Sequence, residues 1–273
     1  MSGTFNQRRT SRILSHMSEL KGFSPSGELS PIKKTQVRVE RVDSLGVGLG
    51  EGTVDKVSVD VMSPSGRSRK MTLAEKRLYD DNPKKWREDL TRQIIQTHSK
   101  LKALGLPVVP TLRIDEDRPD SIYMTDLTRD GKADVYSVMD WAMINERRGK
   151  LSNTGKRVLI SNAEQLSEQI SDLYAQACAK SVRLTSTDIF FLVVDKDTEK
   201  ARIILGDLSG VEFPEDQPYA NAEENHHTLC LFIDYMNERL KLKNQLNKQS
   251  IETAHQAFFD AFEAKYDAEE GAD

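Results

Sequence analysis

Alternating hydrophobic and polar positions predict β-strands in the first third of the chain. Three segments, at residues 36–42, 54–61 and 67–78, place valine or another apolar residue at about every second position. A glycine occupies every second position of residues 46–52, and Ser-Pro-Ser-Gly at residues 63–66 is typical of a tight turn. We therefore expect three antiparallel strands joined by short connections.

A helical pattern follows, because apolar residues recur at three- and four-residue spacing over residues 83–104. Pro83 suits the first turn of a helix, Gly105 suits its end, and Pro107 cannot continue it. Two more strand-like segments come next, at residues 108–114 and 121–127.

From residue 133 the pattern is mainly helical, interrupted by one predicted hairpin. The expected helices cover residues 134–146, 162–181, 221–243 and 249–266, and the hairpin strands cover 189–194 and 201–205. Ser161 or Asn162 is available to cap the second helix. Strands precede helices in this order, which predicts an α+β fold. The expected parts are a flexible arm (1–34), a sheet-containing lobe (35–127), a helical lobe (128–266) and an acidic tail (267–273).

Composition narrows the function classes. The 273 residues include 39 basic and 43 acidic side chains, for a net charge of -4, which gives no field suited to a polyanion. We expect no nucleic-acid partner. No stretch approaches the roughly 20 apolar residues that cross a bilayer, and no secretory signal is visible. These features predict a cytoplasmic protein without a membrane partner.

The cysteines and histidines lack the spacing of a metal site or a disulfide framework. Cys178 and Cys230 are far apart and each lies in an apolar helical context, so we expect buried, inert thiols. His98, His226 and His227 have no ligand partner at helical spacing, so we expect surface or packing roles for them.

Two features of the predicted sheet fit a phosphate-binding site. Gly48, Gly50 and Gly52 lie between the first two strands, where glycines allow backbone amides to approach phosphate oxygens. Lys76 lies on the third strand in an Ala-Glu-Lys sequence. The element order and these residues resemble the protein-kinase and aminoglycoside-phosphotransferase superfamily, over about residues 35–240. The resemblance implies a two-lobed fold with a small antiparallel sheet and one long helix in the first lobe, and a mainly helical second lobe.

The resemblance also implies which residues bind the nucleotide. It implies that Lys76 binds phosphates and pairs with a helix glutamate, yet the expected positions are Gln96 and Thr97. Glu88 and Asp89 are acidic, but they lie two turns earlier in the helix than the expected partner of Lys76. Met124 and Asp126 fall at the hinge, where backbone groups of the family bind the adenine edge.

The second lobe carries two aspartates at positions of the family's metal ligands. Asp188 aligns with the asparagine of the catalytic loop, and Asp207 resembles the aspartate of Asp-Phe-Gly, with Leu-Ser-Gly following it. Arg183 occupies the position of the catalytic aspartate, and an arginine cannot accept the proton of a substrate hydroxyl.

These residues lead to three expectations that share ATP and Mg²⁺ as cofactors. One is a kinase-like enzyme that transfers a phosphoryl group to a protein or small-molecule hydroxyl. Another is a pseudokinase that acts as a nucleotide-binding interaction module. The third is an enzyme of this fold with other nucleotidyl-transfer chemistry, such as transfer of AMP. Arg183 favours the last two, whereas Lys76, Asp188 and Asp207 argue for a retained nucleotide site.

Overall fold

A computed structural model of the chain describes residues 37–47, 52–62, 68–114, 120–138, 158–240 and 242–270. These residues form two compact units. The first contains the described residues up to Ser99 together with Val109–Asp126, and the second contains Lys100–Val108 and the described residues from Leu127 onward. The predicted arm at residues 1–34 lies outside the described residues, as do Gly48 and Gly50.

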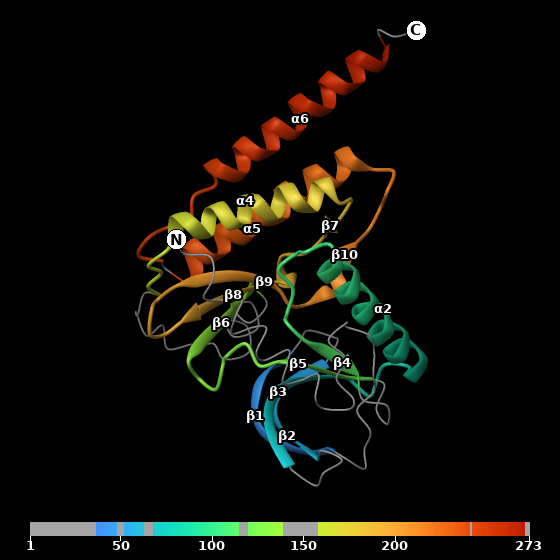
Figure 1. Ribbon diagram of the computed structural model, residues 1–273, viewed down its shortest axis with the longest axis vertical. Helices are drawn as coiled ribbons and strands as arrows, with labels where there is room; N and C mark the ends of the chain where they lie inside the picture. Colours follow the sequence, from blue (N-terminus) through green and yellow to red (C-terminus); the bar gives the residue numbers. More distant parts are fainter. Residues whose placement is uncertain are drawn as a thin grey trace. The chain divides into compact units, whose positions relative to one another are not determined.

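The first unit is built on a five-stranded antiparallel sheet (Figure 1). Its strands are β1 (Val37–Val47), β2 (Gly52–Met62), β3 (Ser68–Leu78), β4 (Leu112–Ile114) and β5 (Ser121–Thr125), in the spatial order β1-β2-β3-β5-β4. The predicted three-stranded arrangement is confirmed, and β1 extends five residues beyond residue 42, as far as Val47. Small antiparallel sheets and helices together confirm the coarse prediction of an α+β fold.

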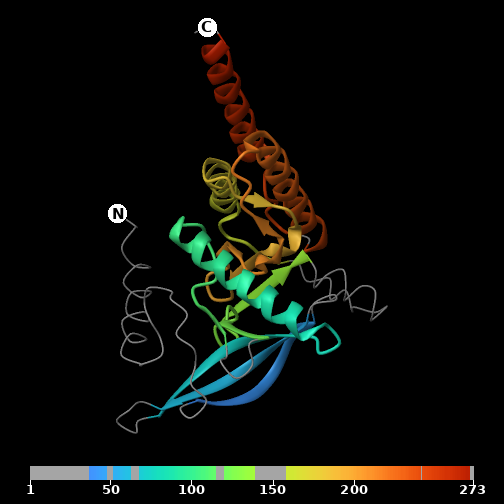
Figure 2. The ribbon, with the colours of Figure 1, turned by 90° about the vertical axis from the view of Figure 1, so that its right-hand side faces the viewer.

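Helix α2 (Lys84–Ala103) connects β3 to β4, as the apolar spacing predicted. In both views it runs alongside the sheet, next to β4 (Figures 1 and 2). Ile94, Ile95 and Leu101 are buried on one side of the helix. Gly105 follows the helix in the left-handed conformation, with φ of 77°, which explains why a glycine ends it.

The second unit contains a three-stranded antiparallel sheet in the order β6-β8-β9. Strands β8 (Phe190–Asp195) and β9 (Ala201–Leu205) form the predicted hairpin. The prediction of a helix from residue 134 is wrong at its start, because β6 (Ala133–Ser137) is a strand paired with β8. Ala133 and Ser137 are buried there, and pairing with a distant strand outweighs the weak local pattern. The rest of that predicted helix, from residue 139, lies outside the described residues.

The described part of the second unit also contains the helices α4 (Ala163–Ala179), α5 (Pro218–Arg239) and α6 (Gln249–Glu270). Helix α6 packs on α4 and α5 and extends beyond their ends towards the C-terminus (Figures 1 and 2). Asn162 stands at the N-cap position of α4, but its side chain makes no capping hydrogen bond. It instead bonds both backbone groups of Ala201, at 2.9 and 2.7 Å, and so fixes the start of β9 against the helix.

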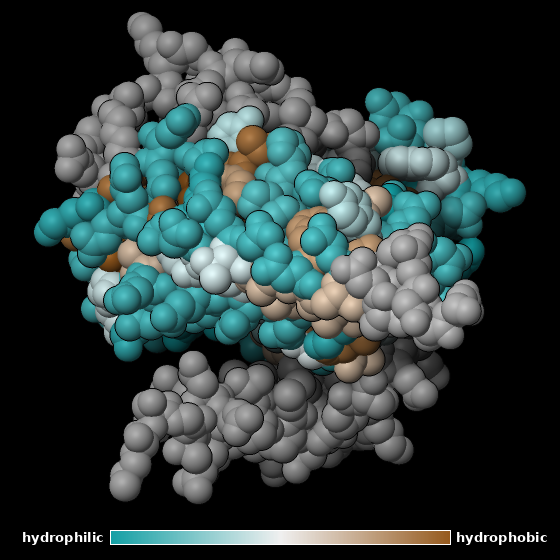
Figure 3. Space-filling view, turned by 90° about the horizontal axis from the view of Figure 1, so that it is seen from above, coloured by the Kyte–Doolittle hydropathy of each residue, from teal (hydrophilic) through white to brown (hydrophobic). Residues whose placement is uncertain are grey.

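The face shown in Figure 3 is mostly hydrophilic, with apolar side chains in small separate patches. Scattered apolar residues of this kind are normal on protein surfaces. Among the described residues, no helix has the length and apolar character needed to cross a membrane.

Candidate functional site

Lys76 lies in the middle of the first unit's sheet. Its neighbours across the strands are Val54 on β2 and Ile122 on β5. Because side chains alternate along a strand, Ala74 shares its face, whereas Glu75 and Arg77 face the opposite way. Only 7% of Lys76 is exposed. A lysine is almost never buried this far without partners, so this amine is a specific feature of the face.

Gly52 has a packing reason for being a glycine. It begins β2 opposite Leu78, and a Cβ added to it would lie 2.0 Å from the carbonyl oxygen of Arg77. Close approach of two strands therefore requires glycine at this position. Gly52 precedes Val54, whose side chain lies beside Lys76 on the same face of the sheet.

The two residues predicted to lie at the adenine edge are on the same face of the sheet as Lys76. Met124 is buried in β5 opposite Ala74. Asp126 comes just after β5 and forms an ion pair with Lys56, with 3.4 Å between Nζ and Oδ2. The carboxylate of Asp126 is thus engaged with β2, which leaves the expected adenine contact to backbone groups.

The candidate acidic partners of Lys76 on α2 have other neighbours. Glu88 lies 3.6 Å from Lys84, and Asp89 lies 3.0 Å from Arg92, both on the exposed side of the helix. Gln96 is exposed and Thr97 is buried. The α2 residues considered from sequence therefore supply no glutamate for Lys76.

In the second unit, Asp188 and Asp207 flank the β8–β9 hairpin at its open end. Phe190 pairs with Leu205, and the next residues continue the ladder, because Gly206 N donates to Ile189 O at 2.8 Å. Asp188 comes just before β8 and Asp207 just after β9, so both lie at the same end of the hairpin. Both residues lie in short 3-10 helices that contact each other, η2 (Thr187–Ile189) and η3 (Leu208–Gly210), with Asp207 as the N-cap of η3.

The small residues around Asp207 hold its loop in place. A Cβ on Gly206 would lie 2.0 Å from the Phe191 ring, so a larger residue would displace that ring. The Oδ1 atom of Asp207 accepts hydrogen bonds from the hydroxyl of Ser209 at 3.1 Å and from its backbone N–H at 3.5 Å. This Asp-Leu-Ser-Gly segment therefore fixes one carboxylate oxygen of Asp207 before any ligand binds.

Asp188 and Asp207 fit the ligand preference of Mg²⁺. Magnesium is commonly held by one or two carboxylates together with substrate phosphates and water. Among the described residues there is no group of three or more histidine, cysteine or acidic side chains that could hold a metal by itself. The pair is thus suited to a metal that arrives with phosphate groups, and not to a metal cage made by the protein alone.

Arg183 is held by residues outside the hairpin. It lies on β7 (Arg183–Leu184), which pairs with β10 (Val211–Glu212). Its Nε donates to Asn221 Oδ1 at 2.8 Å, Nη2 to Gln217 at 2.5 Å, and Nη1 to Glu212 at 3.4 Å. The guanidinium therefore ties β7 to the start of α5, and this structural role explains an arginine at this position.

A second polar cluster in the first unit was missed from sequence. Asp55 and Glu75 are directly opposite on β2 and β3, and both are buried. Arg77 Nη2 lies 2.8 Å from Asp55, and Tyr123 donates to Glu75 at 3.2 Å. The sequence did contain a signal for this cluster. Asp55 is two residues from the buried Val57, and Glu75 is two residues from the buried Leu73, so the strand alternation puts both charged side chains at core-facing positions.

The prediction of packing roles is confirmed for His98, which is buried on α2 with Nε2 2.8 Å from the carbonyl oxygen of Val109. His226 stacks on His255, with 4.0 Å between ring centroids. The prediction of a buried thiol is confirmed for Cys178, whereas Cys230 is only partly buried, and burial raises the pKa of both thiols.

No protein-family model matches the chain, and a search of curated proteins finds no match.

Proposed function

We propose that the chain binds ATP together with Mg²⁺ and acts as a kinase-like nucleotide-binding module. In this proposal the fold is the two-lobed arrangement of the protein-kinase superfamily, Lys76 contacts the phosphates, and Asp188 and Asp207 hold the metal. The observation that carries the proposal is the position of Asp188 and Asp207 at the same end of the β8–β9 hairpin, beside two 3-10 helices that contact each other. Bound Mg²⁺ would neutralise phosphate charge there.

Two features of the first unit support the proposed binding of a nucleotide. The buried amine of Lys76 shares a face with Val54, Ala74 and Ile122, which together offer an apolar surface beside a cation. An apolar surface suits a base, and a cation suits phosphates. The strand-strand-strand-helix-strand-strand order of this unit also supports the resemblance found in the sequence.

Arg183 favours a binding module over an enzyme that phosphorylates hydroxyl groups. The residue cannot act as a base, and its guanidinium is fully engaged in linking β7 to α5. Transfer of AMP, or phosphoryl transfer without a protein base, is the alternative, because such transfers depend mainly on positioning and charge neutralisation.

Thermal unfolding with ATP, with and without Mg²⁺, tests the proposal. At a ligand concentration about 100 times Kd we expect stabilisation of about 2.7 kcal/mol, which raises Tm by roughly 5 to 10 °C. Asp207→Ala and the isosteric Asp207→Asn should remove the Mg²⁺-dependent part. Asp197→Ala, which deletes an exposed carboxylate from the β8–β9 turn, should keep it.

The chemistry is tested separately with ATP labelled at the α- or γ-phosphate. A binding module leaves both labels on the nucleotide, whereas transfer of either label to the protein or to a small acceptor identifies an enzyme. No Tm shift at millimolar ATP would overturn the proposal, and an unchanged shift in both Asp207 variants would place the metal elsewhere.

A further inference from the structure

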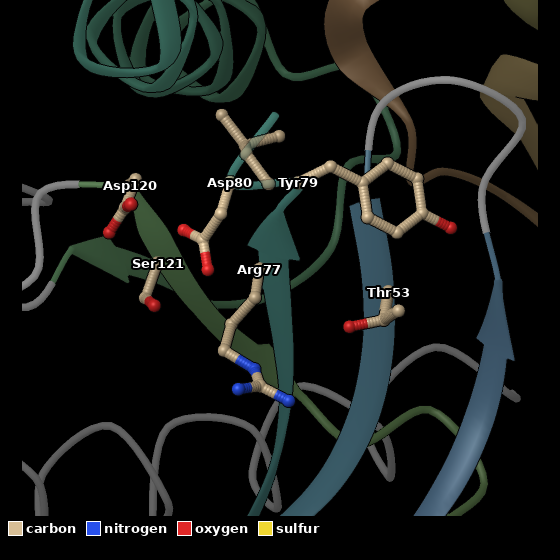
Figure 4. A pocket seen from close by; sticks show the side chains of 7 residues that line it. Thr53, Arg77, Tyr79, Asp80, Asp120 and Ser121 are labelled. Carbon is tan, nitrogen blue, oxygen red and sulfur yellow. The ribbon is translucent and has the colours of Figure 1, made fainter. Parts of the chain in front are cut away.

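The first unit contains a cavity of about 290 Å³ at the end of its sheet (Figure 4). Its polar lining comes from the start of β2, the end of β3 with the turn that follows, and the start of β5. The side chains that line the cavity include those of Thr53, Arg77, Tyr79, Asp80, Asp120 and Ser121. Arg77 directly follows Lys76 on β3, so the two side chains point to opposite faces. The cavity is therefore separate from the surface assigned to ATP.

The charges around the cavity are paired within the protein. Arg87 on α2 bonds Asp80 at 2.7 Å and also bonds Asp120 through the same Nη1 atom. Arg77 bonds the fully buried Asp55 at 2.8 Å. Both arginines at the cavity thus already have acidic partners, and an anionic ligand gains little there.

The cluster as a whole also disfavours an anion. With Glu75, whose Oε2 lies 4.0 Å from Arg77 Nε, the surrounding charges are four carboxylates and two arginines, which sum to -2. Phosphates and carboxylates would meet this excess of negative charge. A neutral ligand avoids the repulsion.

Donors and acceptors of hydrogen bonds both remain at this end of the sheet. The Arg77 side chain is 41% exposed and Thr53 carries a hydroxyl group, so donors are accessible in the cavity lining. The side chain of Asp80 is 97% exposed and that of Asp120 is 26% exposed, so acceptor oxygens are accessible as well.

The lining side chains surround the cavity in a way that suits several small polar groups. Figure 4 shows the Arg77 side chain between Thr53 and Ser121, with the carboxylates of Asp80 and Asp120 on the Ser121 side. A hydroxyl group both donates and accepts hydrogen bonds, so vicinal hydroxyls can satisfy carboxylate and guanidinium groups at once. The Tyr79 ring adds a flat apolar surface at the Thr53 side (Figure 4).

We propose that this cavity binds a neutral, polyhydroxylated small molecule of about the size of a monosaccharide. Its volume lies at the lower limit of the roughly 300 to 1,000 Å³ of ligand pockets, which favours a ligand smaller than a drug. The proposal is independent of ATP binding, because Thr53, Arg77 and Ser121 lie on the face opposite Lys76 and no lining residue belongs to the second unit.

Isothermal titration calorimetry of the whole chain tests the proposal with D-glucose, D-galactose, D-ribose and myo-inositol as probes. Putrescine and inorganic phosphate represent cationic and anionic ligands. We expect saturable binding of at least one polyol, unchanged by added NaCl because no ion pair with the ligand is formed.

Two substitutions and their matched controls locate the site. Asp80→Ala and Thr53→Val each remove one hydrogen-bonding group and should weaken binding roughly three- to tenfold. Asp81→Ala removes the neighbouring exposed carboxylate, and Thr72→Val makes the same isosteric change on the opposite face of the sheet. Both controls should bind like the original chain.

Each result has a defined meaning. Binding of no polyol in the millimolar range overturns the proposal, and so does binding of putrescine or phosphate alone. Polyol binding that the Asp80 and Thr53 variants do not weaken also overturns it, since the ligand would then lie elsewhere. A loss of binding in these two variants, with both controls unchanged, supports it.

Discussion

Lys56 and Asp126 form an ion pair that spans strand β3, with 3.4 Å between their charged atoms. Lys56 lies on β2 opposite Ala74, and Asp126 follows β5 on the far side of β3. The methyl side chain of Ala74 leaves room for the lysine to reach across the sheet. Three strands are thus tied together on the face that carries Lys76.

Removal of Lys56 should destabilise the fold. Only 4% of the Asp126 side chain is exposed, so Lys56→Met leaves a buried carboxylate without one of its partners. We expect a loss of roughly 1–3 kcal/mol in the free energy of unfolding, measured by urea denaturation. The double variant Lys56→Met/Asp126→Asn should recover part of the loss. A single variant as stable as the original chain would show that the ion pair contributes little.

Two glycine substitutions separate steric cost from backbone cost. Gly52→Ala puts a Cβ 2.0 Å from the Arg77 carbonyl oxygen, so β2 and β3 must move apart, at a cost of roughly 1–3 kcal/mol or more. Gly105→Ala meets no atom within 4 Å but has φ of 77°, and should cost about 1 kcal/mol. Denaturation curves of both variants check this order, and the reverse order would contradict it.

Arg183 should matter more for stability than for nucleotide binding. Arg183→Lys keeps the charge but cannot make the three separate bonds to Asn221, Gln217 and Glu212. We expect a loss of roughly 1–2 kcal/mol on urea denaturation, with an unchanged Kd for ATP and Mg²⁺. A weakened Kd with unchanged stability would instead place the guanidinium at the nucleotide.

Much of the sheet was predictable because its information is local. Alternating valines in residues 54–61 specify a strand with one buried face, and a tight turn at 63–66 leaves an antiparallel return as the economical choice. The β8–β9 hairpin is of the same kind, and its antiparallel pairing leaves Asp188 and Asp207 at one end of it.

Features that depend on distant partners were not predictable. Strand β6 was read as the start of a helix, because the partner that makes Ala133–Ser137 a strand is β8, more than 50 residues later. The Asp55–Arg77 ion pair depends likewise on the register of two strands, and a charge pattern in one strand does not give that register. Asn162 looked like a cap, yet its amide bonds Ala201 instead.

The stacked pair of His226 on α5 and His255 on α6 provides a pH-sensitive contact in the second unit. His226 also lies 3.5 Å from the Cys230 sulfur. Burial lowers the pKa of His226 below its ordinary value of 6.5, and the charge of His255 lowers it further, while Glu223 opposes the shift. The neutral ring is therefore the form that the folded chain prefers.

The free energy of unfolding should consequently fall as the pH drops below about 6.5. In that range the unfolded chain binds a proton at His226 more readily than the folded chain does, so acid favours unfolding until the pH passes the lower pKa of the folded state. Urea denaturation at a series of pH values should show this slope. His226→Gln should reduce it, whereas His227→Gln, at the exposed neighbouring position, should leave it intact. An equal slope in the original chain and in His226→Gln would assign the pH dependence to other groups.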